Sequence, residues 1–494
     1  MGGLFYIIGL TLMWVLMTVA AIHVVLDNRQ PAKTMAWVLV ILFIPIVGVL
    51  LYVFLGVSHR RERMVSQRLL DELTKRSMLG FVEQHDLRIP ERHKQLVDLF
   101  INQNLSLPFR DNRVDIMTDG YAFFPELLRD IASATHHIHI DIYIFEDDAL
   151  GRLVSDALRA KARAGVMVRV IYDDVGCWRV SRRFFEDMRK DGVECVSFLP
   201  VHFPSFTSKA NYRNHRKLII IDGRVGYVGG MNIALRYVKG IVDFKKTDAQ
   251  GDETKGLPWR DTMLRLTGGV VYALQRAFLI DWYFVDRTLI TDRIYYPSSV
   301  ATLHAQGEST QALLAQLVTS GPTAPYTEIM QGYVRLILSA RRYIYIETPY
   351  FMPNEPVLFA LKTAAMAGVD VRVICPHYSD TRFTDWASRS YLRELHEAGV
   401  AVWLYEAGFL HSKLMVSDDS VVTCGSTNID FRSFENNFES NVFLFDEGTA
   451  LRLKKVFLDD QKQSVNIASV QGRLHPRFYV RLWESLARLL SPLL

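Results

Sequence analysis

The sequence is poor in cysteine and has almost no excess of charge of either sign. No two of its cysteines have the C-x-x-C spacing of a zinc ribbon, so the sequence indicates neither a zinc site of this kind nor a disulfide framework. Isolated cysteines are typical of proteins in a reducing compartment. The 57 basic and 53 acidic residues leave a formal net charge of +4, which is too balanced for a dedicated nucleic-acid binder. With 49% hydrophobic and 22% charged residues, the 494-residue chain is not a disordered protein. The four cysteines are Cys177, Cys195, Cys375 and Cys424.

Two long apolar runs stand at the N-terminus, separated by a short polar turn. Leu4 to Val25 holds no fully charged residue, and at about 1.5 Å per residue it spans roughly 33 Å, enough for a bilayer core. Met35 to Val57 is the second run, in which Pro45 and Gly48 predict a kink. We expect a transmembrane helical hairpin over residues 1–57. The alternative, a cleaved signal peptide followed by a buried helix, lacks the basic leader that a signal peptide requires.

The distribution of positive charge predicts on which side of the membrane the rest of the chain lies. The turn between the two runs holds Arg29 and Lys33. A larger number of basic residues follows the second run, and the positive-inside rule then places the C-terminal part in the cytoplasm. We therefore expect a protein of the inner (cytoplasmic) membrane with two transmembrane helices. The basic residues that follow the second run are Arg60, Arg61, Arg63, Arg68, Lys75 and Arg76.

Beyond a charged helical linker, expected over residues 58–108, the chain repeats itself. The segment 164–171, AGVMVRVI, returns as AGVDVRVI at 367–374. This separation is far longer than the period of a solenoid and indicates a duplicated domain. In each copy a β-rich run, a helical stretch and a valine-rich strand predict a β-α-β unit, which places helices over parallel strands. We predict two tandem α/β domains, 109–307 and 308–494.

Each copy also carries a His-x-Lys-x4-Asp pattern with an asparagine 17 residues after the histidine. Residues two apart on a strand point to the same face, so each imidazole stands beside an ammonium group. The two aspartates complete the motif and are counted with the catalytic residues, although the residues around them indicate that they form turns. Two copies related by a pseudo-two-fold axis bring two of each group to one active site. The sets are His215, Lys217, Asp222 and Asn232, and His411, Lys413, Asp418 and Asn428.

These side chains suit the transfer of a phosphodiester. The lysines and asparagines stabilise charge on the phosphate oxygens, one histidine attacks phosphorus, and the other gives a proton to the leaving alkoxide. Because the two lysine ammonium groups can balance the negative charge of the phosphate, no metal or other cofactor is expected. A carboxylate on the second ring nitrogen fixes the tautomer of such a histidine. For this role we expect Asp261 to serve His215, and Glu439 to serve His411, each within its own copy.

Several other polar or apolar groups are interpreted as ordinary structure. We expect His136 and His137 at the surface and Cys424 in the core, whereas the paired aspartates at 147–148 and 173–174 are expected in solvated loops. The C-terminal segment from Arg477 has apolar residues at helical spacing with arginines alongside. It predicts either a helix packed on the second domain, which we favour, or a helix at the membrane interface.

The paired motif resembles that of the phospholipase D superfamily, and with the apolar hairpin the chain is similar to the bacterial cardiolipin synthases of that superfamily. The resemblance covers essentially the whole chain. It implies that two phosphatidylglycerols react to give cardiolipin and glycerol through a phosphohistidine intermediate. It also implies that His215 and His411 are the nucleophile and the acid/base, and favours His215 as the nucleophile. One departure is Gly230, where many members carry a serine, as at Ser426.

The sequence leaves alternatives to this function. A membrane-bound phospholipase D or another phosphatidyltransferase would carry the same motif and use water or another alcohol as acceptor. A nuclease of the superfamily needs no membrane anchor and binds a polyanion, which the near-neutral charge disfavours. We therefore expect phosphatidylglycerol and membrane lipid, not nucleic acid, as partners. An inactive membrane scaffold conflicts with two intact motifs, and assembly into a homo-oligomer is left open.

Overall fold

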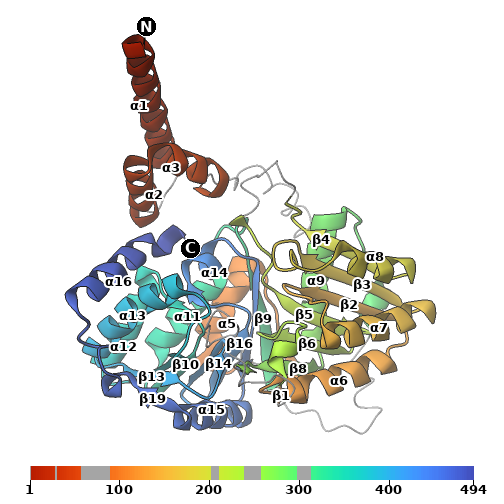
Figure 1. Ribbon diagram of the computed structural model, residues 1–494. Coiled ribbons are helices and arrows are strands. Elements are labelled where there is room, and N and C mark those ends of the chain that lie inside the picture. The colour runs from red at the N-terminus through yellow and green to blue at the C-terminus, as the bar shows by residue number, and fades with distance from the viewer. Residues whose placement is uncertain are drawn as a thin grey trace.

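The body of the protein is built on one continuous sheet, and a helical segment projects from one side of it (Figure 1). The computed structural model describes residues 2–27, 31–56, 89–201, 211–238, 258–297 and 313–493. The sheet has 15 strands in the order β19-β13-β12-β10-β15-β16-β18-β9-β1-β8-β6-β5-β2-β3-β4. The two strand sequences leading outward from the antiparallel central pair β1 and β9 follow the same plan. The predicted pair of tandem α/β domains related by a pseudo-two-fold axis is confirmed.

The first domain contributes seven strands of this sheet. They are β1 (Pro108–Met117), β2 (His137–Ile142), β3 (Met167–Asp173), β4 (Glu194–Phe198), β5 (Lys217–Ile221), β6 (Val225–Gly229) and β8 (Met263–Thr267). The short β7 (Trp259–Arg260) lies outside it and pairs with a strand of the other domain. The helices are α6 (Gly120–Ser133), α7 (Ala149–Arg163), α8 (Arg182–Lys190) and α9 (Val270–Asp286), with 3-10 turns at Leu235–Tyr237 and Arg293–Tyr295. Helix α5 (Glu91–Asn104) precedes this domain and packs on the core of the second domain.

The second domain repeats this arrangement. Its sheet strands are β9 (Leu313–Ser320), β10 (Tyr343–Glu347), β12 (Asp370–Pro376), β13 (Ala401–Tyr405), β15 (Leu414–Ser417), β16 (Val421–Gly425), β18 (Glu439–Phe445) and β19 (Ser464–Asn466). Three short strands are β11 (Phe351–Met352), β14 (Phe409–Leu410) and β17 (Ile429–Asp430). The helices are α11 (Glu328–Ser339), α12 (Glu355–Met366), α13 (Arg382–Glu397), α14 (Phe431–Glu435), α15 (Glu447–Lys462) and α16 (Phe478–Leu490), with 3-10 turns at Ile467–Ser469 and Ser491–Leu493.

Helix α7 shows how the sequence forms the predicted β-α-β units. Asp148 caps its N-terminus by accepting a hydrogen bond from a backbone N–H of the first turn. Gly165 follows its end at φ +89°, a conformation that favours glycine. Val154 and Leu158 are fully buried on its inner face. The flanking strands β2 and β3 are parallel, as are β10 and β12 around α12, so both predicted units are confirmed.

The hydrophobic core is continuous across the two domains at the central strands. Val114 of β1, Phe278 of α9 and Leu317 of β9 belong to one cluster of buried side chains. Residues of β18, including Val442, extend the same cluster into the second domain. A shared core of this kind fixes the two halves relative to one another, because packed interiors deform little. A site made from both halves therefore has a defined geometry.

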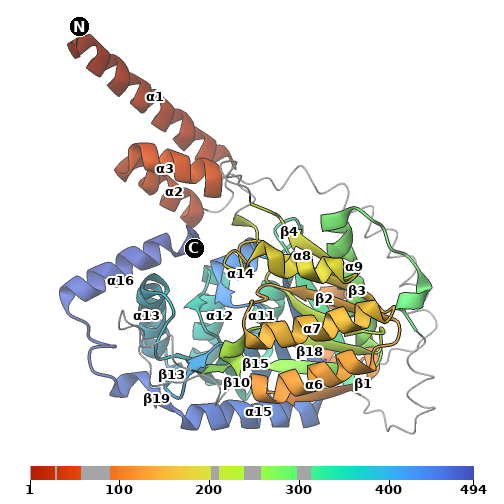
Figure 2. The same cartoon turned by 45° about the vertical axis from the view of Figure 1, so that its right-hand side comes forward.

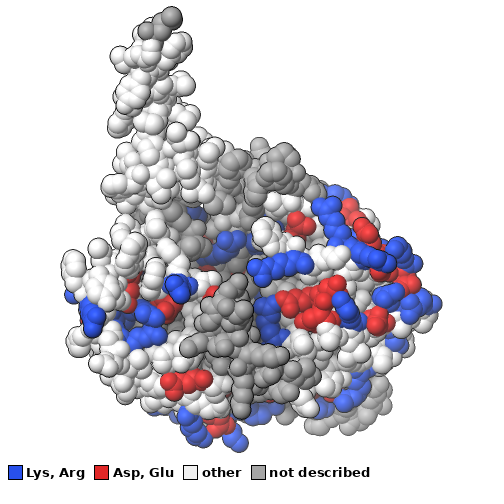
Figure 3. Space-filling view, in the orientation of Figure 1, with Lys and Arg blue, Asp and Glu red and all other residues white. Residues whose placement is uncertain are grey.

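The N-terminal segment, described over residues 2–27 and 31–56, projects from the body, and its described residues show no charged side chain on the face seen in Figure 3. Helix α1 (Gly2–Asp27) is apolar, and at about 1.5 Å per residue it is about 39 Å long, enough to cross a bilayer core. The predicted second span is instead broken into α2 (Pro31–Phe43), α3 (Pro45–Leu51) and a π-helical turn at Tyr52–Gly56. Among the described residues, α1 is the one helix long and apolar enough to cross a membrane.

The break has a local cause, and the prediction of two full spans is not confirmed. Pro45 has no N–H to continue α2 and becomes the first residue of α3. At Gly48 the folded-back chain comes so close that a Cβ would lie 2.5 Å from the carbonyl oxygen of Val40. The 13 residues of α2 reach only about 20 Å. Lys33 near the start of α2 lies 3.7 Å from Glu435 of the second domain, so this end of α2 lies beside the body.

Two groups interpreted as surface residues are buried. His137 has no exposed area and contacts Gln275 through its Nε2 atom, because β2 is an interior strand rather than an edge. Asp173 is also fully buried, and its carboxylate accepts from the backbone N–H of Asn214 at 2.9 Å. Cys424 is buried as expected. Residues 58–88 of the predicted linker, with the basic residues at 60–76, lie outside the described residues.

Candidate active site

The two histidines of the repeated motif meet where the domains join. The backbone N–H of His215 donates to the carbonyl oxygen of Phe438 at 2.9 Å, and that of His411 donates to the carbonyl oxygen of Arg260 at 2.7 Å. Each histidine is thus bonded to the chain of the opposite domain. Lys217 opens β5 and Lys413 directly precedes β15, so each ammonium group follows its imidazole on the same face. The predicted convergence of the two motifs on one site is present in the structure.

The carboxylates that orient the histidines are exchanged between the domains. Nδ1 of His215 lies 3.1 Å from both carboxylate oxygens of Glu439. Nδ1 of His411 lies 2.7 Å from Oδ2 of Asp261. The predicted pairing within each copy is therefore wrong. Asp261 lies two residues before β8, and Glu439 is the first residue of β18. Both strands lie between their own motif strands and the domain junction, so both side chains reach across it.

Both lysines are buried beside the histidines. Nζ of Lys217 donates to the carbonyl oxygen of His215 at 2.6 Å. Nζ of Lys413 lies 2.8 Å from Nδ1 of His411 and 3.9 Å from Asp261. Burial lowers the pKa of Lys217 to about 7 and that of Lys413 to about 8. The charge of the empty site therefore changes near neutral pH, and a bound anion favours the protonated lysines.

Burial also governs the protonation of the histidines and their carboxylates. It lowers the pKa of His215 to about 4 in spite of the neighbouring Glu439. It lowers the pKa of His411 well below the usual value, and Lys413 adds to the effect. Burial raises the pKa of Asp261 to about 6 against the influence of Lys413. For Glu439, His215 and nearby Lys217 outweigh burial and keep the pKa below its usual value. At neutral pH the empty site holds two neutral imidazoles.

The motif aspartates lie at the far ends of β5 and β15 and are structural. Asp222 accepts from the backbone N–H groups of residues 135–137 and Asp418 from those of residues 341–343, the starts of β2 and β10. Both have positive φ, 53° and 52°, as turn residues do. These contacts agree with the interpretation of both aspartates as turn-forming residues, and we infer that neither takes a direct part in the chemistry.

The two asparagines differ in their contacts. Asn232 accepts from the backbone N–H of Ile144 at 3.0 Å and donates to the hydroxyl of Tyr237 at 3.1 Å, which engages both ends of its amide. The backbone N–H of Asn428 bonds Ser433, while its buried side-chain oxygen has no hydrogen-bond partner in the described part of the chain. Contact of either amide with phosphate stays a prediction.

Gly230 is explained by its neighbour. A Cβ at this position would lie 2.6 Å from Oδ2 of Asp261, so a side chain would overlap the carboxylate that holds His411. In the other half, the hydroxyl of Ser426 donates to the carboxylate of Glu439. The glycine that replaces the usual serine of the family thus lies beside Asp261, the shorter of the two acids that orient the histidines.

Aromatic rings and two arginines around the histidines were not found from the sequence. Tyr143 lies edge-on to His215 at 5.0 Å between ring centroids, and Trp259 lies 4.7 Å from His411. The guanidinium of Arg236 lies 5.0 Å from the Trp259 ring. Arg432 stands 21 residues after His411, as Arg236 does after His215. This equal spacing from the two motif histidines is the pattern by which both arginines could have been found from the sequence.

No group of three or more histidine, cysteine, aspartate or glutamate side chains within the described ranges is arranged to hold a metal ion. The absence of a cofactor stays a prediction.

Comparison with known proteins places this site in a family. The family model for "Cardiolipin synthase, PLD-like domain" matches residues 127–243 and 333–461, and that for "Phospholipase_D-nuclease N-terminal" matches 15–56. "Major cardiolipin synthase ClsA" of Bacillus subtilis is 37% identical over 507 residues, covering 98% of each chain. "Cardiolipin synthase 2" of Bacillus anthracis is 39% identical over 475 residues, covering 95% of this chain and 88% of the relative.

Among solved structures, the phosphatidylserine synthase of Haemophilus influenzae matches with a TM-score of 0.59 at 15% identity, covering 82% of this chain and 100% of that one. At this identity the match supports the fold alone. The fold, the paired motif and the full-length similarity to curated relatives agree. The chain belongs to the cardiolipin synthase family of phospholipase D-like proteins.

Proposed function

We propose that this protein transfers the phosphatidyl group of one phosphatidylglycerol to the headgroup hydroxyl of another, giving cardiolipin and glycerol. The observation that carries the proposal is the pair of buried histidines, each held by a carboxylate of the opposite domain beside a buried lysine. Double displacement at phosphorus needs one group that attacks and another that carries a proton. The exchanged carboxylates make one site from two motifs.

The surroundings of the two rings favour different roles. Among the described residues, the carboxylate of Glu439 is the one side-chain partner of Nδ1 of His215, so this nitrogen carries the proton and Nε2 keeps its lone pair for attack. Nδ1 of His411 faces both Asp261 and Lys413. Asp261 stabilises the protonated form of the His411 ring, and Lys413 stabilises its neutral form. This balance suits a group that gains and loses a proton. The charge of bound phosphate raises the low pKa of His411 toward the range where it acts as an acid.

The reaction then proceeds in two displacements. Nε2 of His215 bonds to phosphorus, the bond from phosphorus to the glycerol oxygen breaks, and His411 protonates that oxygen. Glycerol leaves, and a second phosphatidylglycerol takes its place. His411 removes the proton from its headgroup hydroxyl, the new oxygen–phosphorus bond forms and the nitrogen–phosphorus bond breaks. Lys217 and Lys413 stabilise the charge on the phosphoryl oxygens in both steps.

Two arginines beside the histidines support a lipid rather than water as acceptor. Arg236 stacks on Trp259, which in turn contacts His411, and its side chain is one-third exposed although it pairs with Glu146. Arg432 is half-buried and has no ion pair with a carboxylate in the described part of the chain; its charge acts on Tyr143 at the other histidine. An acceptor with its own phosphate needs a cation besides the two lysines, whereas water does not.

The test is a product analysis with phosphatidylglycerol as sole substrate in mixed micelles, read by mass spectrometry. The proposal predicts cardiolipin and glycerol in equal amounts. Phosphatidic acid as the main product would overturn it in favour of a phospholipase. In the same assay, Arg236→Gln and Arg432→Gln should raise the share of phosphatidic acid while the adduct still forms. An unchanged product ratio in both would remove the arginines from acceptor binding.

We further propose that α1 is the crossing helix and that the body lies on the cytoplasmic side. The contact of Lys33 with Glu435 supports a turn between α1 and α2 on the same side as the body. Arg29, Lys33 and the later basic residues then share one side, which strengthens the charge bias. Labelling of single cysteines in intact cells tests it: a cysteine at residue 3 should react with a membrane-impermeant reagent, and a cysteine at Leu451 should not. The opposite pattern would reverse the orientation.

A further inference from the structure

Helix α16 is attached to the second domain by one side only. Glu484, buried on that side, accepts from Arg393 of α13 at 2.8 Å. Arg488 donates to Glu394 at 2.6 Å and lies over the ring of Tyr391, 4.2 Å from its centroid. The favoured expectation of a helix packed on the second domain is correct for this side, and it fixes how α16 is rotated about its axis.

The opposite side of α16 is a stripe of large apolar side chains facing outward. Phe478, Leu482, Leu486 and Leu489 recur at helical spacing and are between 41% and 82% exposed. A patch of this kind on a folded body marks an interaction surface. We name the stripe, with its aromatic neighbours, the α16 face. Its members are Phe478, Tyr479, Leu482, Trp483, Leu486 and Leu489.

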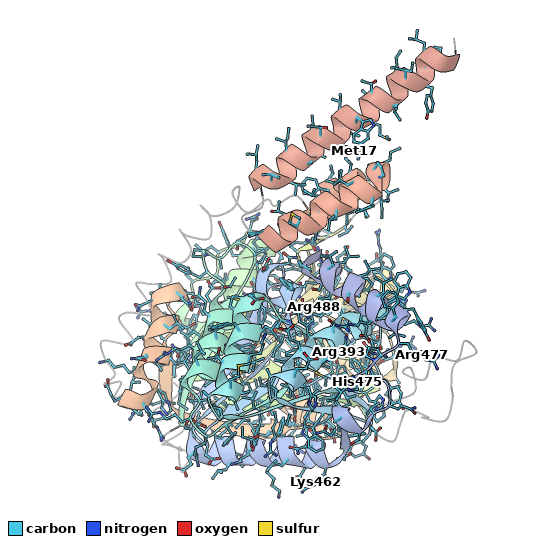
Figure 4. The ribbon with its side chains drawn as sticks, turned by 90° about the vertical axis from the view of Figure 1, so that its left-hand side faces the viewer. Met17, Arg393, Lys462, His475, Arg477 and Arg488 are labelled. Carbon is cyan, nitrogen blue, oxygen red and sulfur yellow. The ribbon has the colours of Figure 1, made fainter. Side chains whose placement is uncertain are left out.

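The position of the α16 face indicates what covers it. The turn Ser491–Leu493, which follows α16, contacts α2 of the apolar N-terminal segment. Figures 1 and 2 both show α16 beside the base of that segment, on the side of the body from which α1 projects. Figure 4 shows Arg488 of α16 below this segment, and Lys462 of α15 on the opposite side of the body. The α16 face is therefore continuous with the surface that α1 brings to the bilayer.

The charges of α16 match an anionic bilayer. Arg477 and Arg481 flank the α16 face, and neither forms an ion pair with a carboxylate of the described residues. Glu484, the one acidic residue of α16, is buried and paired. The 13 residues of α16 reach about 20 Å, too short to span a bilayer core. A short helix with aromatic and leucine side chains on one face and arginines at its edge fits the plane of the headgroups.

We propose that α16 lies in the interface of an anionic membrane and forms a second anchor, independent of α1, that holds the catalytic body against the bilayer. The occupant of the α16 face is thus lipid, and its apolar side chains enter the boundary between headgroups and acyl chains. This inference does not depend on which alcohol accepts the phosphatidyl group.

The test uses the full chain in vesicles containing phosphatidylglycerol. All four native cysteines are buried, so a fluorophore can be placed selectively on Leu482→Cys and, as matched control, on Leu451→Cys of α15, which is 46% exposed. Acrylamide reports contact with water, and a nitroxide-bearing phospholipid reports contact with lipid. We expect quenching by acrylamide to be about fivefold weaker at 482 than at 451, and quenching by the nitroxide lipid to be strong only at 482.

Other outcomes overturn the proposal. Equal quenching by acrylamide at both positions would show a face open to water. Protection of position 482 from both quenchers would show that protein covers the face, as in a dimer of this chain. In a second variant of the labelled chain, Arg477→Gln with Arg481→Gln should raise acrylamide quenching at 482 several-fold. No change in that variant would remove the electrostatic part of the proposal.

Discussion

The two halves of the active site carry the same motif but support their histidines differently. His215 is held by the longer acid, Glu439, whose carboxylate also accepts from Ser426. His411 is held by the shorter acid, Asp261, against which Gly230 leaves room, and Lys413 lies at the same ring nitrogen. The comparison shows that a duplicated domain need not give equivalent sites. One half keeps a lone pair free for attack, whereas the other is arranged for proton transfer.

The largest expected effect removes either imidazole. If the site needs one attacking and one proton-carrying group, His215→Ala and His411→Ala should each lower the rate of cardiolipin formation by about 10⁴-fold or more. The check is the initial rate in mixed micelles, with the thermal unfolding midpoint confirming that each variant is folded. A single variant with near-normal output would show that the two halves act independently.

A matched pair of alanine substitutions sharpens the difference between the halves. Gly230→Ala adds a Cβ against Asp261, moves the acid from His411 and should lower kcat by about 100-fold. Ser426→Ala removes one hydrogen bond to Glu439 and should lower kcat by about tenfold. Both are measured by the same lipid assay. A larger loss for Ser426→Ala would mean that the crowding at Gly230 is relieved without moving Asp261.

The lowered pKa values of the two lysines predict a pH-dependent affinity for anions. As pH rises through about 7 to 8, the free ammonium groups lose their protons, so the affinity falls with rising pH. Sulfate suits the test because its own charge is constant in this range. We expect calorimetry to show about tenfold weaker binding at pH 8.5 than at pH 6.5. Constant affinity over this range would mean that the lysines stay charged in the empty site.

The smallest effect on turnover is expected at the motif aspartates. Asp222→Asn and Asp418→Asn keep a residue that tolerates positive φ but weaken the hydrogen bonds to the starts of β2 and β10. Each should lower the free energy of unfolding by about 1 kcal/mol and leave the rate per folded molecule nearly unchanged. Denaturant unfolding and the lipid assay measure the two quantities. A rate lowered by orders of magnitude in a folded variant would return these residues to the catalytic set.

Local patterns in the sequence predict the parts of this molecule that depend on local physics. The β-α-β units follow from the cap at Asp148 and the glycine at 165, and the turns at Asp222 and Asp418 follow from residues that accept positive φ. The histidines and lysines were found because the same spacing occurs twice. These features need only a few neighbouring residues to be specified.

The exchange of carboxylates between the domains and the break in the second apolar run depend on contacts between separate segments of the chain. The spacing of residues in the sequence does not predict such contacts. Glu439 is 28 residues from His411 and 224 from His215, yet it bonds the latter, because strand order decides which side chains face the junction. The fold-back at Gly48 depends on packing against α2. His137 and Asp173 are buried because β2 and β3 are interior strands of the sheet. Two adjacent polar residues in the sequence do not show where their strand lies in the sheet.

The central claim is that Glu439 of the second domain prepares His215 of the first for attack. It is tested by quenching a reaction of phosphatidylglycerol, labelled in its phosphatidyl group, in alkali, where phosphohistidine survives, and mapping the labelled peptide. We expect label on the peptide with His215 and its loss in Glu439→Gln, while Glu439→Gln leaves the thermal unfolding midpoint near that of the parent chain. Label on the peptide with His411, or label on His215 that persists undiminished in Glu439→Gln, would contradict it.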